Sequence, residues 1–146
     1  MVADTANEPT PWRRILLVWL GISVLLLAIN WRSIAESRFL DPDDMLRLVQ
    51  VRDLIGGQGW FDLHQYRIDP AASPVMHWSR IVDVPIALAM LLLRPLFGPE
   101  LGDHIAVVLV PLFTLLVLMA VAGRMAFRLF DREVATFACL SIGFSP

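Results

Sequence analysis

The sequence predicts an all-α, polytopic membrane protein, with transmembrane helices and with interfacial helices in a long first external loop. Of the 146 residues, 57% are apolar or aromatic, above the roughly 45–50% of an ordinary globular domain. These residues are concentrated in blocks at 15–29, 84–93, 105–122 and 134–144. Arginines flank the longest blocks, and basic flanks indicate which end of a span faces the cytoplasm.

Charge and cysteine content exclude several classes of protein. Twelve basic against 14 acidic residues give a net charge of −2, so no basic patch for nucleic acid is expected. All basic residues are arginine, which excludes a Schiff-base or P-loop lysine. The single Cys139 excludes disulfides, thiolate zinc clusters and iron–sulfur centres within this chain.

The first apolar block follows a polar tail at residues 1–14 that ends in Arg13 and Arg14. Residues 15–31 approach the roughly 20 residues that a span requires, and the positive-inside rule places the N-terminus in the cytoplasm. A cleaved signal peptide is the rival interpretation, but Trp31 and Arg32 fit a cleavage region poorly. We therefore expect an uncleaved first transmembrane helix.

The second transmembrane helix is expected at residues 105–123. Its run at 105–122 has no charge and is followed by three arginines, so its C-terminal end faces the cytoplasm. Residues 32–104 then form one external loop, and 124–133 form a cytoplasmic loop. Residues 134–146 begin a third span that the end of the chain truncates, so we expect an N-terminal fragment of a longer protein.

Two interfacial helices are expected in the external loop, near 42–55 and 84–97. The first has Asp41 as cap and Pro42 at its first position, and Gly56 ends it. Arg52 interrupts its apolar side, which fits a helix at headgroup depth with a snorkelling arginine. The second has too few apolar residues to cross a membrane.

Acidic residues crowd the start of the first of these helices. Asp41, Asp43 and Asp44 lie within four positions, and capping needs only one of them. Like charges so close repel unless a cation relieves them, so the three are candidate ligands of a divalent cation, Mg²⁺ or Mn²⁺. Capping alone is the competing explanation.

A second polar cluster comprises His77, Arg80 and Asp83. We expect it to be a solvated patch at headgroup level, unless the loop folds it back over the aspartates. The aromatic residues Trp60, Tyr66 and Trp78 are expected to lie at the membrane interface, as belt residues do.

The order of these features resembles the N-terminal part of GT-C membrane glycosyltransferases. The run FLDPDDMLR at 39–47 looks like the Phe-Asp-Pro-x-x-x-Tyr-Arg region of oligosaccharyltransferase catalytic subunits, and equally like the Pro-Asp-Glu motif of protein O-mannosyltransferases and lipid A aminoarabinose transferases. In the first comparison Asp41 takes the place of the catalytic aspartate; in the second Asp43 does, with Asp44 replacing the glutamate. The Lys-Pro-Pro motif of these families is missing near His77 and Arg80.

The resemblance implies the N-terminal part of an inner-membrane glycosyltransferase that moves a sugar from a polyprenyl-phosphate donor to an external acceptor. Asp41 or Asp43 would be catalytic, and the choice between them stays open. Candidate contacts to the donor phosphate are Arg80, Arg47 and His77. The expected partners are membrane lipid, the donor, and the rest of the longer chain, without which the fragment is inactive.

The alternative is a transporter component or small membrane scaffold in which the aspartates only cap a helix. No ionisable residue lies within 105–122, and this absence disfavours an ion or proton pathway. It leaves a scaffold open.

Overall fold

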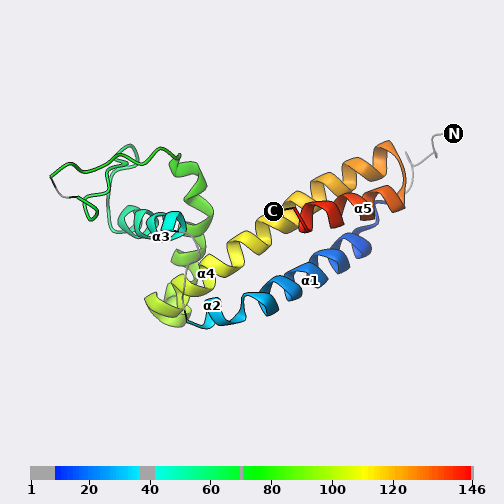
Figure 1. Cartoon of the computed structure of the whole chain (residues 1–146), viewed down its shortest axis with the longest axis horizontal. Helices are drawn as coiled ribbons and strands as arrows, with labels where there is room; N and C mark the ends of the chain where they lie inside the picture. Colours follow the sequence, from blue (N-terminus) through cyan, green and yellow to red (C-terminus); the bar gives the residue numbers. More distant parts are fainter. Residues whose placement is uncertain (1–8, 37–41, 70, 146) are drawn as a thin grey trace. The chain divides into compact units, whose positions relative to one another are not determined.

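The computed structural model describes residues 9–36, 42–69 and 71–145, and all the named elements in these ranges are helical (Figure 1). The all-α class predicted from the sequence is thus confirmed for the described residues. The elements in chain order are α1 (Trp12–Ile29), α2 (Trp31–Ala35), α3 (Pro42–Ile55), the 3-10 helix η1 (Arg80–Val82), α4 (Val84–Leu129) and α5 (Arg132–Gly143).

Two helical stretches are long and apolar enough to cross a membrane, namely Trp12–Ile29 and part of Arg80–Leu129. In the most apolar 18-residue window of each stretch, 17% of the first window and 11% of the second is buried inside the chain. Both windows therefore lie mostly on the surface of the described chain. Their length and composition indicate membrane association.

The chain divides into two compact units. One contains the described residues of Met1–Arg32 and Pro111–Pro146, and the other is Ser33–Val110. Each unit has its own cluster of buried apolar side chains.

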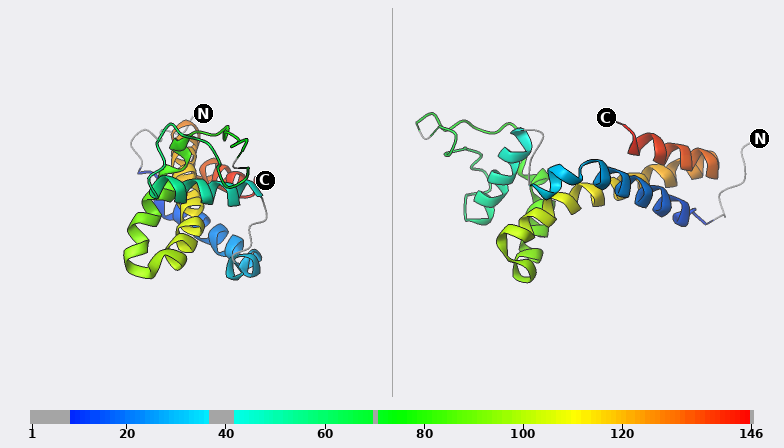
Figure 2. Two further views of the ribbon diagram at one scale, coloured as in Figure 1. Left: turned by 90° about the vertical axis from the view of Figure 1, so that its left-hand side faces the viewer. Right: turned by 60° about the horizontal axis from the view of Figure 1, so that its bottom comes forward.

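In the first unit α1, the end of α4 and α5 lie side by side (Figures 1 and 2). Trp19 Nε1 donates a hydrogen bond of 2.8 Å to the carbonyl oxygen of Leu112, which joins α1 to α4. A Cβ at Gly123 would lie 2.8 Å from Cys139 Sγ, so glycine allows α4 and α5 to approach closely. The apolar core of this unit consists of Ile15, Ile22, Met119 and Cys139.

In the second unit α4 bends sharply at Gly98, whose φ of 80° lies in the left-handed region that favours glycine. The segments on either side of Gly98 turn back on each other. Their backbones come so close that a Cβ at Gly102 would lie 2.9 Å from the backbone nitrogen of Arg94. Asp103 joins the same two segments by accepting from Arg94 Nε at 2.7 Å and from Nη2 at 3.0 Å. The helix that the sequence predicts near 84–97 therefore ends at a real break.

α3 has the bounds that the sequence predicts, and Val51 packs its inner face against Ala87 and Met90 of α4. The expected cap, Asp41, lies outside the described residues. Arg52 of this helix is paired, since its Nε donates to Asp103 Oδ2 at 2.8 Å, while 45% of its side chain is exposed.

Candidate functional site

Two of the three predicted acidic residues, Asp43 and Asp44, occupy the first turn of α3. Asp43 and Asp44 are exposed there, where a carboxylate is favoured by the positive end of the helix dipole. Adjacent helical residues point about 100° apart, so these two do not converge on one point. Among the described residues, no three His, Cys, Asp or Glu side chains are grouped to hold a metal ion, and Asp41 lies outside those residues.

Arg47 lies one turn after the aspartates on α3, four positions from Asp43. Side chains at this spacing are neighbours, with Cβ atoms roughly 5–6 Å apart. The Arg47 guanidinium lies over the ring of Trp78, with Cζ 5.2 Å from the ring centroid, a cation–π contact. His77 meets the same indole edge-on at 4.8 Å between centroids. Two residues predicted from the sequence, Arg47 and His77, thus lie against Trp78.

Trp78 is held in place by a buried amide. Its Nε1 donates a 2.7 Å hydrogen bond to Gln50 Oε1, and Gln50 is fully buried in α3. The sequence treats Trp78 as a belt aromatic and gives Gln50 no role. The signal that identifies Gln50 is its position beside Val51 on the helix face that packs inward.

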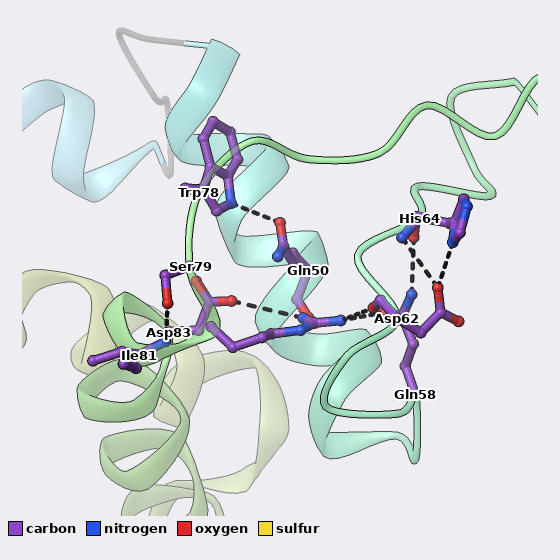
Figure 3. Close-up of polar contacts among 9 residues, drawn as sticks. Gln50, Gln58, Asp62, His64, Trp78, Ser79, Ile81 and Asp83 are labelled. Atoms are coloured by element: carbon purple, nitrogen blue, oxygen red, sulfur yellow. Dashed lines mark hydrogen bonds and ion pairs between the residues drawn. The ribbon is translucent and has the colours of Figure 1, made fainter.

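Arg80 is 3% exposed and connects α3 to the loop that follows it. Its Nη1 donates to the carbonyl oxygen of Gln50 at 3.0 Å, and its Nη2 donates to Gln58 Oε1 at 2.9 Å and to the carbonyl oxygen of Asp62 at 2.6 Å. Figure 3 shows Gln50, Gln58 and Asp62 around these bonds. An anion could reach the Nη atoms of Arg80 only by displacing these three oxygens.

Asp83 is completely buried, with Oδ2 3.6 Å from Arg80 Nη1. Neither carboxylate oxygen has a hydrogen-bond partner among the described residues. Burial raises the pKa of Asp83, while the charges of Arg80 and Arg47 act in the opposite direction. The expectation of a solvated patch is therefore wrong for Arg80 and Asp83, because the loop returns onto α3 and covers them; His77 is exposed.

A separate exposed cluster lies in the loop around Asp62. Its Oδ1 lies 2.7 Å from His64 Nδ1 and accepts from the His64 backbone N–H at 3.2 Å. Tyr66 donates its hydroxyl to Oδ2 at 3.1 Å. The His64 hydrogen bonds lower the pKa of Asp62 from 3.8 to about 2, so this carboxylate is ionised at neutral pH.

The arrangement at the start of α3 combines exposed carboxylates that can accept a proton with an arginine that an aromatic ring holds in place. Such a pair suits a substrate that loses a proton at one atom and carries a phosphate at another. Comparisons of the chain with protein-family models, with curated proteins and with solved structures gave no match.

Proposed function

We propose that this chain is the N-terminal part of an integral membrane glycosyltransferase that moves a sugar from a polyprenyl-phosphate donor to an external acceptor. It is a multi-pass protein of the cell inner membrane, with a cytoplasmic N-terminus. The rest of a longer chain completes the site, so these residues are inactive alone.

One observation carries the proposal. Asp43 and Arg47 share a face of α3, and Arg47 stacks on Trp78 with His77 against the same ring. In the chain, α3 comes after α1 and the short α2, and α1 is one of the two stretches suited to crossing a membrane. A lipid-linked donor carries its phosphate at headgroup depth, the level to which the end of a membrane helix leads.

The chemistry assigns each group a step. The carboxylate of Asp43, or of Asp41, takes the proton of the acceptor as the acceptor atom forms its bond to the anomeric carbon. The bond from that carbon to the phosphate oxygen breaks, and polyprenyl phosphate leaves with the electron pair. Arg47 neutralises the charge that develops on the phosphate, with His77 beside it. Arg80 is a positioning residue, since it holds the loop that carries Trp78.

A divalent cation held by Asp41, Asp43 and Asp44 is a separate part of the proposal. The two described carboxylates do not converge, so the described residues alone do not fit such an ion, and no step above depends on it. Chelation with EDTA followed by addition of Mg²⁺ or Mn²⁺ tests this part: transfer that needs neither ion would remove it from the proposal.

The test of catalysis uses the longer protein in native membrane vesicles, which retain the acceptor. The assay measures polyprenyl phosphate released from a panel of polyprenyl-phosphate sugars, for Asp41→Ala and Asp43→Ala separately. Loss of a general base lowers the rate by about 100-fold or more. The control is Asp53→Ala on the same helix, whose carboxylate pairs with Arg67 at 2.8 Å.

Unchanged release in both Asp41→Ala and Asp43→Ala, with the protein still folded, would refute the catalytic assignment. That result would favour the scaffold or transporter component, because exposed aspartates in a first helical turn are also what capping and the helix dipole alone produce. The coding sequence after residue 146 gives an independent check: about eight or more further apolar spans favour the enzyme.

A further inference from the structure

An apolar groove of about 400 Å³ lies within the unit Ser33–Val110, between the end of α3 and the first part of α4. Trp60, from the loop after α3, also lines it. Every lining side chain is predominantly hydrocarbon, so a polar occupant would lose hydrogen bonds to water without replacing them. The helical residues that line the groove are Leu54, Ile55, Val84, Ala87, Leu88 and Leu91.

One end of the groove is cationic. Arg52 lies one turn before Ile55 on α3, and Arg94 lies one turn after Leu91 on α4, so both arginines lie beyond the same end of the lining. They meet at Asp103, whose side chain is 3% exposed. Two arginines against one carboxylate leave one net positive charge there. Arg52 uses Nε for its bond to Asp103, and 45% of its side chain is exposed, so an anion can reach its guanidinium.

Apolar residues that neighbour two of the lining residues in sequence are also exposed. Phe61 is 94% exposed beside Trp60, and Leu92 is 72% exposed beside Leu91. Exposed large apolar side chains are typical of interaction sites, and α4 continues into the most apolar stretch of the chain. A small water-soluble anion would satisfy Arg52 but leave this surface uncovered.

We propose that the groove binds one anionic glycerophospholipid of the membrane, with an acyl chain along α4 and its phosphate at Arg52. The lining from Val84 to Leu91 extends roughly 10 Å along the helix, which accommodates the upper part of an acyl chain. The guanidinium of arginine suits bidentate contact with a phosphodiester. This lipid is a resident component distinct from the sugar donor, and its binding does not depend on the proposed transfer reaction.

The test places the full chain in phosphatidylcholine vesicles that contain increasing fractions of lipid brominated on its acyl chains. Bromine quenches nearby tryptophan, and the signal of Trp60 among the five tryptophans is the difference between the parent chain and Trp60→Phe. Brominated phosphatidylglycerol is expected to reach half-maximal quenching at a mole fraction about fivefold below that of brominated phosphatidylcholine, since one basic residue near the surface attracts an anionic lipid by about this factor.

Arg52→Gln is expected to abolish this preference, bringing the two lipids to about the same half-maximal fraction. In this variant Asp103 still accepts two hydrogen bonds from Arg94, so its carboxylate keeps a charged partner. The matched control is Arg67→Gln, another arginine paired with an aspartate, which is 70% exposed and is not a lining residue; this variant is expected to keep the preference. Circular dichroism of each variant checks that helix content is unchanged.

A second pair of variants tests the hydrocarbon part. Leu88→Gln, in the lining, weakens quenching by both lipids about fivefold, whereas Leu92→Gln, on the same helix but outside the lining, leaves it unchanged. The proposal is overturned if the parent shows no preference for phosphatidylglycerol, if Arg52→Gln keeps it, or if Leu92→Gln weakens quenching as much as Leu88→Gln. Absence of any Trp60 quenching would show that the groove does not meet lipid.

Discussion

Replacing Arg80 with methionine should release the loop at 56–79 from α3. Methionine fills similar space but removes the donors to the three oxygens described above and leaves Asp83 buried without its nearest positive charge, 3.6 Å away. Breaking a buried pair by removing one partner costs about 3–5 kcal/mol. We expect the lower end, about 3 kcal/mol, because burial already favours the neutral form of Asp83.

Hydrogen exchange measured by mass spectrometry detects this change directly. The backbone N–H groups of Gln65 and Met76 report on the loop, since they donate to Pro74 and Leu63 at 2.9 Å. A loss of about 3 kcal/mol lowers their protection about 100-fold, at 1.4 kcal/mol for each factor of ten.

Two comparisons make the result decisive. Arg67→Met removes an exposed ion pair worth at most about 1 kcal/mol. In this variant the hydrogen-exchange protection of the same two N–H groups should fall no more than about fivefold. Arg80→Met with Asp83→Asn removes both charges together and is expected to recover about tenfold of the protection lost in the single variant. Equal effects of Arg80→Met and Arg67→Met would refute the structural role of Arg80, and a double variant no better than the single one would refute the buried-charge argument.

Three further changes test other parts of the chain. Gly123→Ala would bring a Cβ to 2.8 Å from Cys139 Sγ and 3.1 Å from Ile15 Cδ1, so the free energy of unfolding in SDS should fall by about 1–3 kcal/mol; Gly21→Ala, which meets nothing within 4 Å, should leave it unchanged or raise it by up to about 1 kcal/mol. Gly98→Ala places a side chain at a φ of 80° and should weaken the hydrogen-exchange protection of residues 99–104, because such a backbone costs about 1–3 kcal/mol for a residue other than glycine. The pKa of Asp62 is about 2 in the folded chain, against an ordinary value of 3.8. The ionised carboxylate therefore stabilises the loop fully above pH 3.8, and this stabilisation is lost as the pH falls from 3.8 to about 2. A ¹³C NMR titration should therefore show a midpoint near 2 that moves up toward 3.8 in His64→Ala, and an unmoved midpoint would refute His64 as the cause.

Local sequence signals are enough to predict α3. Pro42 and Gly56 bound α3 because proline favours a first helical position and glycine a termination, and both rules act within a few residues. The break at Gly98 is harder to place from the sequence, since Pro95 and Pro99 flank it and either is a plausible boundary.

Burial in the second unit depends on contacts that no local pattern encodes. Arg80 lies 30 residues from Gln50 along the chain, and its burial follows from the return of the loop onto α3. Arg52 is also paired at long range, because its partner Asp103 lies 51 residues away, although 45% of the Arg52 side chain stays exposed. Long-range pairings of single charged residues leave no periodic signal, so a solvated arginine is the natural expectation for both.

α3 therefore carries two arginines with separate partners, and this separates the two proposals physically. Five positions along a helix correspond to a rotation of about 140°, so Arg47 and Arg52 point to different sides. Arg47 meets Trp78, while Arg52 meets Asp103 beside the apolar groove. A phosphate bound at one arginine does not occupy the other, so Arg47→Gln should lower sugar transfer without changing the lipid preference, and Arg52→Gln should do the reverse. A variant that changed both would show that the two arginines serve a single ligand.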